Sequence, residues 1–211
     1  MLIGICGKSG CGKSTLARAL MENHENALHL DIDKVGHAVL TIEEVKQELV
    51  KSYGESILSE EKIDRKKLGD IVFNSRIEMK KLSDITWKYM QIEIDKFLEN
   101  NKDKIIILDW LLLPISKYFD MCDIKILLDI PYEVRKERAM KRDNITEEAF
   151  DTREKASIDF DKNTFDYVIN DNNLEEIRKL VKLIWQEFYI QEVLILLQRD
   201  IWILLSKQVN Y

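Results

Sequence analysis

The chain has 211 residues, enough for one domain of ordinary size with a small insertion. Hydrophobic residues make up 45% and charged residues 33%, with only 7 Gly and 2 Pro, so the collagen-like, low-complexity and disordered classes are excluded. The formal net charge of −6 disfavours sequence-independent binding of nucleic acid, although a local basic cluster could still bind a small polyanion.

The cysteines and the start of the chain bear on its location. Cys6, Cys11 and Cys122 are an odd number without the spacing of a zinc site, so we expect reduced thiols. The apolar start is interrupted by Lys8 and Lys13 and has no small-residue cleavage site, which argues against a signal peptide. No apolar run is long enough to span a membrane. We therefore expect a cytoplasmic protein.

Short apolar runs alternate with longer stretches of helical period, which is typical of parallel strands joined by crossover helices. The predicted strands are Leu2–Cys6, Ala27–Leu30, Ile105–Leu108, Ile124–Leu128 and Tyr167–Ile169. The predicted helices are Ser14–Glu22, Ile42–Leu58, Arg65–Phe73, Ile77–Asn100, Tyr132–Lys141, Glu147–Ile158 and Leu174–Phe188. Gly7, Asp31, Asp109 and Asp129 follow four of the strands. Because ligands bind outside the carboxyl ends of such strands, we expect the glycine-rich loop and the acids to share one edge of the sheet.

The spacing of the elements predicts how the chain is organised. Residues 1–190 are expected to form one α/β domain, with a helical substrate-side insertion at about 34–103 and a lid at about 131–158. Residues 191–211 form a hydrophobic helical tail, in which Val193–Leu197 and Ile201–Leu205 are apolar almost all round the helix. Such a helix must be covered. Packing on its own domain and a dimer interface both stay open, and attachment to a membrane surface is less favoured.

The segment Gly7-Lys8-Ser9-Gly10-Cys11-Gly12-Lys13-Ser14 fits the pattern G-x-x-x-x-G-K-[ST], after a strand and at the start of a helix. The glycines let successive backbone N–H groups point at phosphate oxygens, and the helix adds its positive dipole end. Lys13 is expected to serve the β and γ phosphates, facing solvent when no ligand is bound, and Ser14 to bind Mg²⁺. Cys11 is a small filler. The loop predicts nucleotide binding by residues 7–15, from Gly7 to Thr15.

Carboxylates follow two of the strands. Asp31 and Asp33 come after the second strand and are expected to alternate onto the same side. Phosphoryl transfer needs a carboxylate that accepts the proton of the attacking hydroxyl, and Asp33 is the candidate base. Asp31 fits a strand-end cap as well as it fits a functional role. Asp109 could hold a magnesium-bound water or cap a helix.

Three arginines, Arg135, Arg138 and Arg142, are spaced three and four residues apart and so line one helix face. Arginines on a lid that closes over a triphosphate stabilise the transferring phosphoryl group. A solvated face with Glu137 paired to Lys141 is the alternative. Beside a phosphate loop we favour the functional role for Arg138 and Arg142, whereas Arg135 fits both interpretations.

Taken together, residues 1–175 resemble the dephospho-coenzyme A kinase family of P-loop kinases. The resemblance rests on the phosphate loop, Asp31-x-Asp33, Tyr53-Gly54, Ile63-Asp64-Arg65-x-x-Leu68 before Val72-Phe73, Arg138-x-x-x-Arg142-Asp143, and Asp166-Tyr167-Val168-Ile169-Asn170. It implies a three-layer sandwich of the P-loop nucleoside triphosphate hydrolase type, with a parallel five-stranded sheet. It also implies transfer of the γ-phosphoryl group of ATP, with Mg²⁺, to the ribose 3′-hydroxyl of dephospho-coenzyme A, the last step of coenzyme A biosynthesis.

On this resemblance the catalytic candidates are Asp33, Lys13, Arg138 and Arg142, and the substrate-binding candidates are Asp31, Arg65 and Asp109. The chain departs from the family on the acceptor side. Trp87-Lys88 replaces His-Pro, and Trp110-Leu111-Leu112-Leu113-Pro114 replaces Pro-Leu-Leu-x-Glu. The tryptophans could stack on a base, so a kinase of another nucleoside or nucleotide is a second hypothesis. A third is a nucleotide-binding regulatory protein without turnover. The tail could mediate homo-oligomerisation.

Overall fold

A computed structural model describes residues 1–22, 24–72, 75–155, 157–171 and 173–208. In this part of the chain a parallel five-stranded sheet has the order β2-β5-β1-β6-β7. Its strands are β1 (Leu2–Cys6), β2 (Ala27–Asp31), β5 (Ile105–Asp109), β6 (Ile124–Leu128) and β7 (Tyr167–Ile169). All five predicted strands are confirmed, and two of them extend by one residue to include Asp31 and Asp109. Every residue of β1 and β5 is buried, as expected of parallel strands covered on both faces.

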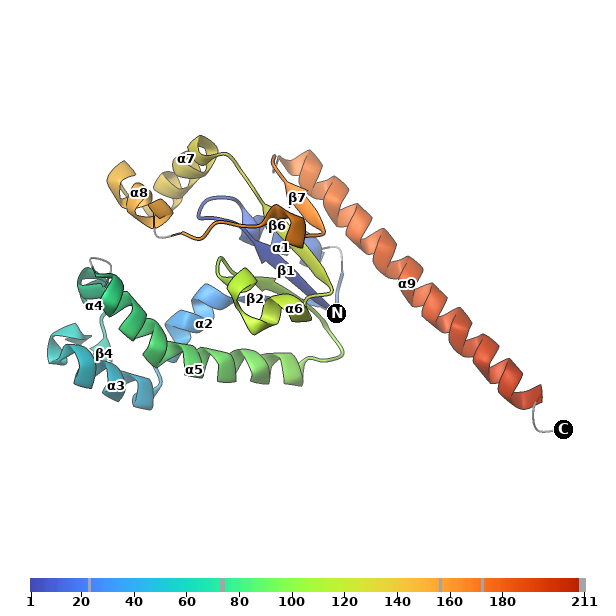
Figure 1. Cartoon of the computed structure of the whole chain (residues 1–211), viewed down its shortest axis with the longest axis horizontal. Helices are drawn as coiled ribbons and strands as arrows, with labels where there is room; N and C mark the ends of the chain where they lie inside the picture. Colours follow the sequence, from blue (N-terminus) through green and yellow to red (C-terminus); the bar gives the residue numbers. More distant parts are fainter. Residues whose placement is uncertain (23, 73–74, 156, 172, 209–211) are drawn as a thin grey trace.

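The sheet lies between two layers of helices, which confirms the predicted three-layer sandwich (Figure 1). One face is covered by α1 (Lys13–Glu22) and the first part of α9 (Leu174–Gln208). The other face is covered by α5 (Arg76–Asn100) and α6 (Lys117–Met121). Alternation along β1 supplies both cores, because Ile3 and Ile5 face the first layer and Leu2 and Cys6 the second.

The segment between β2 and β5 has its own small core. It contains α2 (Ile32–Val39), α3 (Glu43–Tyr53), η1 (Glu55–Ile57), β3 (Leu58–Ser59), β4 (Lys62–Ile63), α4 (Arg65–Val72) and the start of α5. Val45, Leu49, Ile57, Leu68 and Val72 form the buried cluster that holds these elements together.

Two predictions for this segment were wrong. Helix α2 was missed, and the helix predicted over 42–58 ends at Tyr53. Gly54 has a φ of 80°, a conformation that favours glycine and cannot continue the helix, and a 3₁₀ turn and a two-stranded hairpin follow it. Phe73, the predicted end of the next helix, lies outside the described residues.

Two helices, α7 (Tyr132–Asp143) and α8 (Glu147–Lys155), project from the sheet after β6. Asn144, with a φ of 51°, makes the sharp turn between them. Helix α8 ends at Lys155, so it is shorter than the helix predicted over 147–158. Figure 1 shows α7 and α8 at the same edge of the sheet as the segment between β2 and β5. The loop between β1 and α1 lies at that edge too.

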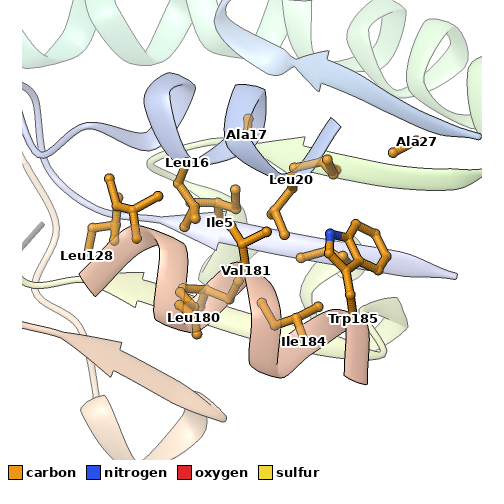
Figure 2. Packing of buried hydrophobic residues seen from close by; sticks show 14 of the residues in the cluster. Ile5, Leu16, Ala17, Leu20, Ala27, Leu128, Leu180, Val181, Ile184 and Trp185 are labelled. Atoms are coloured by element: carbon orange, nitrogen blue, oxygen red, sulfur yellow. The ribbon is translucent and has the colours of Figure 1, made fainter. Parts of the chain in front are cut away.

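Helix α9 continues where separate helices were predicted. Figure 2 shows its side chains directed at β1 and α1; those labelled on α9 are Leu180, Val181, Ile184 and Trp185. Beyond them, Tyr189, Ile190, Val193 and Leu194 are exposed, and the helix runs away from the sheet (Figure 1). Side-chain burial at 195–211 lies outside the described residues, as does the backbone of 209–211. In the described part of the chain, no helix has a stretch long and apolar enough to cross a membrane.

Candidate active site

The loop between β1 and α1 has the backbone that a phosphate cradle needs. Gly7, Gly10 and Gly12 all have positive φ angles, of 148°, 81° and 98°. A Cβ on Gly10 would lie 2.2 Å from the carbonyl oxygen of Arg135, so a side chain cannot be accommodated there. Helix α1 begins within the motif, and the N–H groups of Thr15 and Leu16 donate to the carbonyl of Gly12. The curled loop and the helix start thus meet as the motif predicted.

The cysteine inside the loop fills space. Cys11 is fully buried, and burial raises the pKa of its thiol. A Cβ on Gly7 would meet the Cys11 sulfur at 2.6 Å, which shows how tightly the thiol is packed. Cys6 and Cys122 are buried as well, and none of the three cysteines forms a disulfide. Reactivity depends on the thiolate, so these residues are structural.

The lysine and serine of the loop converge on Asp109 at the end of β5. The Ser14 hydroxyl donates to Asp109 Oδ2 over 3.0 Å, and Lys13 Nζ lies 3.9 Å from Asp109 Oδ1. Lys13 also donates to the carbonyl of Gly7 over 3.0 Å and is 14% exposed. The expectation that its ammonium faces solvent was therefore wrong, because these two partners draw it inward. Burial lowers the pKa of Lys13, but the net shift is upward, and the nearby carboxylates of Asp109 and Asp33 are among its causes.

His29 completes this cluster and was missed in the sequence. Its Nε2 lies 3.3 Å from Asp109 Oδ2, so the buried carboxylate is approached by a lysine, a serine and a histidine. The strand period could have indicated it, because His29 precedes Asp31 by two residues on β2 and so shares its face. The pairing of β2 with β5 sets Asp31 opposite Asp109 and His29 opposite Ile107, two residues earlier on β5, so the His29 side chain reaches Asp109 diagonally.

The pair formed by Ser14 and Asp109 suits a magnesium site. A serine hydroxyl and a nearby carboxylate that binds through water are the usual protein share of Mg²⁺ coordination in phosphate sites, where phosphate oxygens supply further ligands. Among the described residues no group of three or more His, Cys, Asp or Glu side chains is placed to hold a metal by itself. Ser14 and Asp109 are accordingly the candidates.

Asp31 and Asp33 stand at the same edge, but not by alternation along a strand. Asp31 ends β2 and caps α2, its Oδ1 accepting from the N–H of Lys34 over 3.2 Å. Asp33 lies in the first turn of α2, so the alternation that the sequence suggested does not apply. The Asp33 side chain is accessible to solvent, yet the surrounding protein desolvates it and raises its pKa. Lys13 opposes this rise, and the charges of Asp31 and Asp109 add to it.

Arg65 begins α4 on the insertion and is exposed. Asp64 caps this helix, with its Oδ1 accepting from the N–H groups of Lys66 and Lys67 at 2.9 and 3.2 Å. A hydrogen bond from Ser59 is the main cause that lowers the pKa of Asp64. The aspartate of the motif is therefore structural, and the role of Arg65 toward a substrate stays a prediction.

Burial separates the three arginines of α7. Arg135 is 5% exposed and donates to Glu154 of α8 over 2.7 and 2.9 Å and to the carbonyl of Ile130 over 2.8 Å. Arg138 and Arg142 are exposed, and Arg142 donates twice to Asp143, at 2.7 and 3.0 Å. That interaction is the main reason why the pKa of Asp143 falls to about 2. Arg135 thus has a structural role that its spacing alone did not distinguish.

Glu154 connects α8 to the phosphate loop and had no signal in the sequence. Its Oε1 accepts from Lys8 Nζ of the loop over 3.2 Å while both its oxygens bind Arg135. The hydrogen bond from Arg135 is the main cause that lowers the pKa of Glu154, so the carboxylate is ionised at neutral pH. Lys8 and Glu154 are 146 positions apart in the sequence, and Arg135 and Glu154 are 19 apart. No local sequence pattern extends over such separations.

We expect Glu154→Gln to lower the free energy of unfolding by about 1.5 to 3 kcal/mol, because it removes the charge that a buried arginine needs. Denaturant unfolding measures the change. Glu137→Gln, an exposed change on α7, is the matched control and should be near neutral. Equal stability of the two variants would contradict a structural role for the Arg135–Glu154 pair.

The parallel sheet, the phosphate loop and the carboxylates at its edge define a P-loop kinase. The sequence model of the dephospho-CoA kinase family matches residues 1–176. The dephospho-CoA kinase of Aquifex aeolicus is 40% identical over 88% of this chain and 96% of its own length. That of Fusobacterium nucleatum is 32% identical over 86% and 95%. The chain belongs to the dephospho-CoA kinase family.

Solved structures agree on the fold. TT1252 from Thermus thermophilus superposes with a TM-score of 0.74 at 24% identity, covering 89% of this chain and 97% of that one. The dephospho-CoA kinase from Campylobacter jejuni gives 0.63 at 24% identity, over 89% and 96%. The P-loop kinase fold predicted from the sequence is confirmed.

Proposed function

We propose that the protein transfers the γ-phosphoryl group of ATP to the ribose 3′-hydroxyl of dephospho-coenzyme A. The observation that carries this proposal is the meeting of Lys13, Ser14, Asp109 and Asp33 at one edge of the sheet, in a chain that belongs to this family. A phosphate-binding loop and a carboxylate of raised pKa are the two parts that transfer to a hydroxyl requires.

The donor half follows from the loop. Backbone N–H groups within the loop of residues 7–15 bind the phosphates of ATP, and the Lys13 ammonium neutralises charge on the β and γ oxygens. Mg²⁺, held by Ser14 and through water by Asp109, supplies charge neutralisation when bound. Lys13 and Ser14 are positioned for this by α1, whose first residues they are.

The acceptor half rests on the acids. Asp33 accepts the proton of the 3′-hydroxyl, whose oxygen forms the new bond to the γ phosphorus while the bond to the bridging oxygen breaks and ADP leaves. Burial raises the pKa of Asp33, which makes its carboxylate a stronger base than that of an ordinary aspartate. Asp31 and Arg65 bind the acceptor from β2 and α4.

The lid closes the site in this proposal. Helices α7 and α8 bring Arg138 toward the transferring phosphoryl group and exclude water. The second candidate on α7, Arg142, donates twice to Asp143. The insertion at about 34–103 is then the acceptor side and residues 131–158 the lid.

We expect Arg138→Ala to lower kcat by about 10²-fold and to change the affinity for ATP much less, because the guanidinium acts on the transition state. Steady-state kinetics with a separate ATP titration measures both. Lys141→Ala, an exposed change on the same helix, is the control. A kcat equal to that of the control would indicate that Arg138 belongs to a solvated helix face and takes no part in the reaction.

The proposal as a whole is tested by ATP consumption with dephospho-coenzyme A beside a panel of nucleosides and nucleotides. Phosphorylation of dephospho-coenzyme A with the highest kcat/KM supports it. Preference for another nucleotide would favour the second kinase hypothesis, and ATP binding without turnover on any acceptor would favour a regulatory protein. We further propose a cytoplasmic location, since three thiols outside disulfides suit a reducing compartment.

We also propose that the tail mediates self-association. Tyr189, Ile190, Val193 and Leu194 form an exposed apolar stretch on α9, and the sequence beyond them continues apolar. Light scattering of the full chain and of a chain ending at residue 190 tests this: a dimer or larger assembly that becomes monomeric on truncation supports it, and a monomeric full chain contradicts it.

A further inference from the structure

A cavity of about 310 Å³ opens between α5 and the segment that follows β5. Its walls are formed by Ser83, Thr86, Trp87, Met90, Trp110, Leu112, Ile115 and Ser116. None of these eight side chains carries a charge. The volume and the mainly apolar lining with a few polar groups are typical of sites for small molecules.

The cavity adjoins the proposed catalytic edge. Trp110 directly follows Asp109 along the chain, and its N–H donates to the carbonyl of Ile5 on β1 over 3.2 Å. Met90 packs against α2, since a Cβ on Gly36 would lie 3.4 Å from the Met90 methyl group. Gly36 is three residues beyond Asp33 on the same helix. One wall of the cavity is therefore in contact with the helix that carries the candidate base.

The two tryptophans stack on each other. Their ring centroids are 5.2 Å apart with an angle of 21° between the planes, and Trp110 is 6% exposed. Each indole has one face committed to the other, so a base cannot be inserted between them as a sandwich. The stacked pair instead provides one continuous apolar wall.

The polar groups of the cavity offer acceptors. The hydroxyls of Ser83, Thr86 and Ser116 donate their protons to backbone carbonyls at 3.0, 2.9 and 2.8 Å. Each oxygen retains lone-pair capacity that can receive an N–H group. A phosphate would need a cation here, and none of the eight lining side chains carries a positive charge. The indole N–H groups of Trp87 and Trp110 are the remaining donors among these side chains. A neutral chain of methylene and secondary amide groups matches both the walls and the hydroxyl oxygens.

We infer that this cavity binds the pantetheine arm of the acceptor, a neutral chain of amide and methylene groups that ends in a thiol. The inference rests on the proposed function, because it names the part of dephospho-coenzyme A that does not react. The flexible Met90 thioether adapts the wall to such a chain. The cavity then selects dephospho-coenzyme A over nucleotides that lack the arm.

Binding measured without turnover tests the inference. Isothermal titration calorimetry of the full chain, with Mg²⁺ and a saturating non-hydrolysable ATP analogue present, compares dephospho-coenzyme A with AMP, which has the adenosine but no arm. Ser83→Trp fills the mouth of the cavity from an exposed position, and Ile115→Trp fills it from the opposite wall, where Ile115 is 72% exposed. Asp84→Trp adds the same bulk one residue along α5, outside the cavity.

The wild type should bind dephospho-coenzyme A at least about tenfold more tightly than AMP, and either filling variant should remove that advantage without weakening AMP. Asp84→Trp should preserve it. No advantage in the wild type would overturn the inference, and so would an equal loss for both ligands in both filling variants, which would indicate a site for the adenosine that the two ligands share. Absence of turnover on dephospho-coenzyme A would refute the proposed function and is read in a separate assay.

Discussion

Lys13→Ala should lower kcat by about 10²- to 10³-fold and weaken ATP binding, the effect expected when one preorganised charge is removed from a phosphoryl-transfer site. The structure gives a reason for this size. Lys13 is held by the Gly7 carbonyl and lies near Asp109, so its ammonium is already in place when phosphates bind. The charge acts in surroundings where water screens it little. Coupled-assay kinetics and calorimetric titration of ATP measure the two effects.

The fold of this variant should survive, because Lys13 contributes one hydrogen bond to the loop and Asp109 keeps its hydrogen bond from Ser14. Thermal unfolding with a midpoint within a few degrees of wild type is the expected result. Lys102→Ala, an exposed change in the turn that follows α5, controls for loss of a positive charge. Full activity of Lys13→Ala would refute the assignment of the phosphate loop as the donor site.

The sequence predicted the sheet well because its signals are local. Buried parallel strands are largely apolar runs, and the run Ile105–Leu108 ends where the polar Asp109 begins. The phosphate loop has a fixed spacing that could be recognised without the fold. Asp31 and Asp109 were placed correctly at strand ends for the same reason.

The errors arose where a residue type fits two local structures or where the partner is distant. Asp31 can end a strand or cap a helix, and reading Ile32 and Asp33 as an extended continuation hid α2. Arg135, Arg138 and Arg142 look alike in the sequence, and only the position of Glu154 across α8 makes the first of them structural. His29 and the cavity beside Trp110 depend in the same way on contacts between separate elements.

Asp33→Asn should lower kcat by about 10²- to 10⁴-fold while ATP still binds, because the amide keeps the size of the side chain but cannot accept the proton. The pH dependence identifies the group. The ionised form is the active base, so wild-type kcat should fall as the pH drops through the raised pKa of Asp33, and this acid limb should vanish in the variant. Measurements of kcat across the acid range for both proteins provide the comparison.

Stability should move in the opposite direction to activity. A carboxylate whose pKa is raised by folding favours the folded state when protonated and opposes it when ionised, so removing the charge at neutral pH should leave the melting temperature equal to or above that of wild type. Lower activity with undiminished stability would separate a catalytic role from a structural one. A variant that loses both would indicate that Asp33 supports α2 rather than the reaction.

Asp31→Asn decides which acid is the base. Asp31 accepts a hydrogen bond from the backbone of Lys34 and ends β2, so its amide variant should retain most of kcat and raise the KM of the acceptor. The reverse pattern, near-normal turnover in Asp33→Asn and loss of turnover in Asp31→Asn, would identify Asp31 as the base in place of Asp33. If both variants kept near-normal turnover, neither acid would be the base, and the leaving proton would have to be taken up by solvent or by the phosphoryl oxygens.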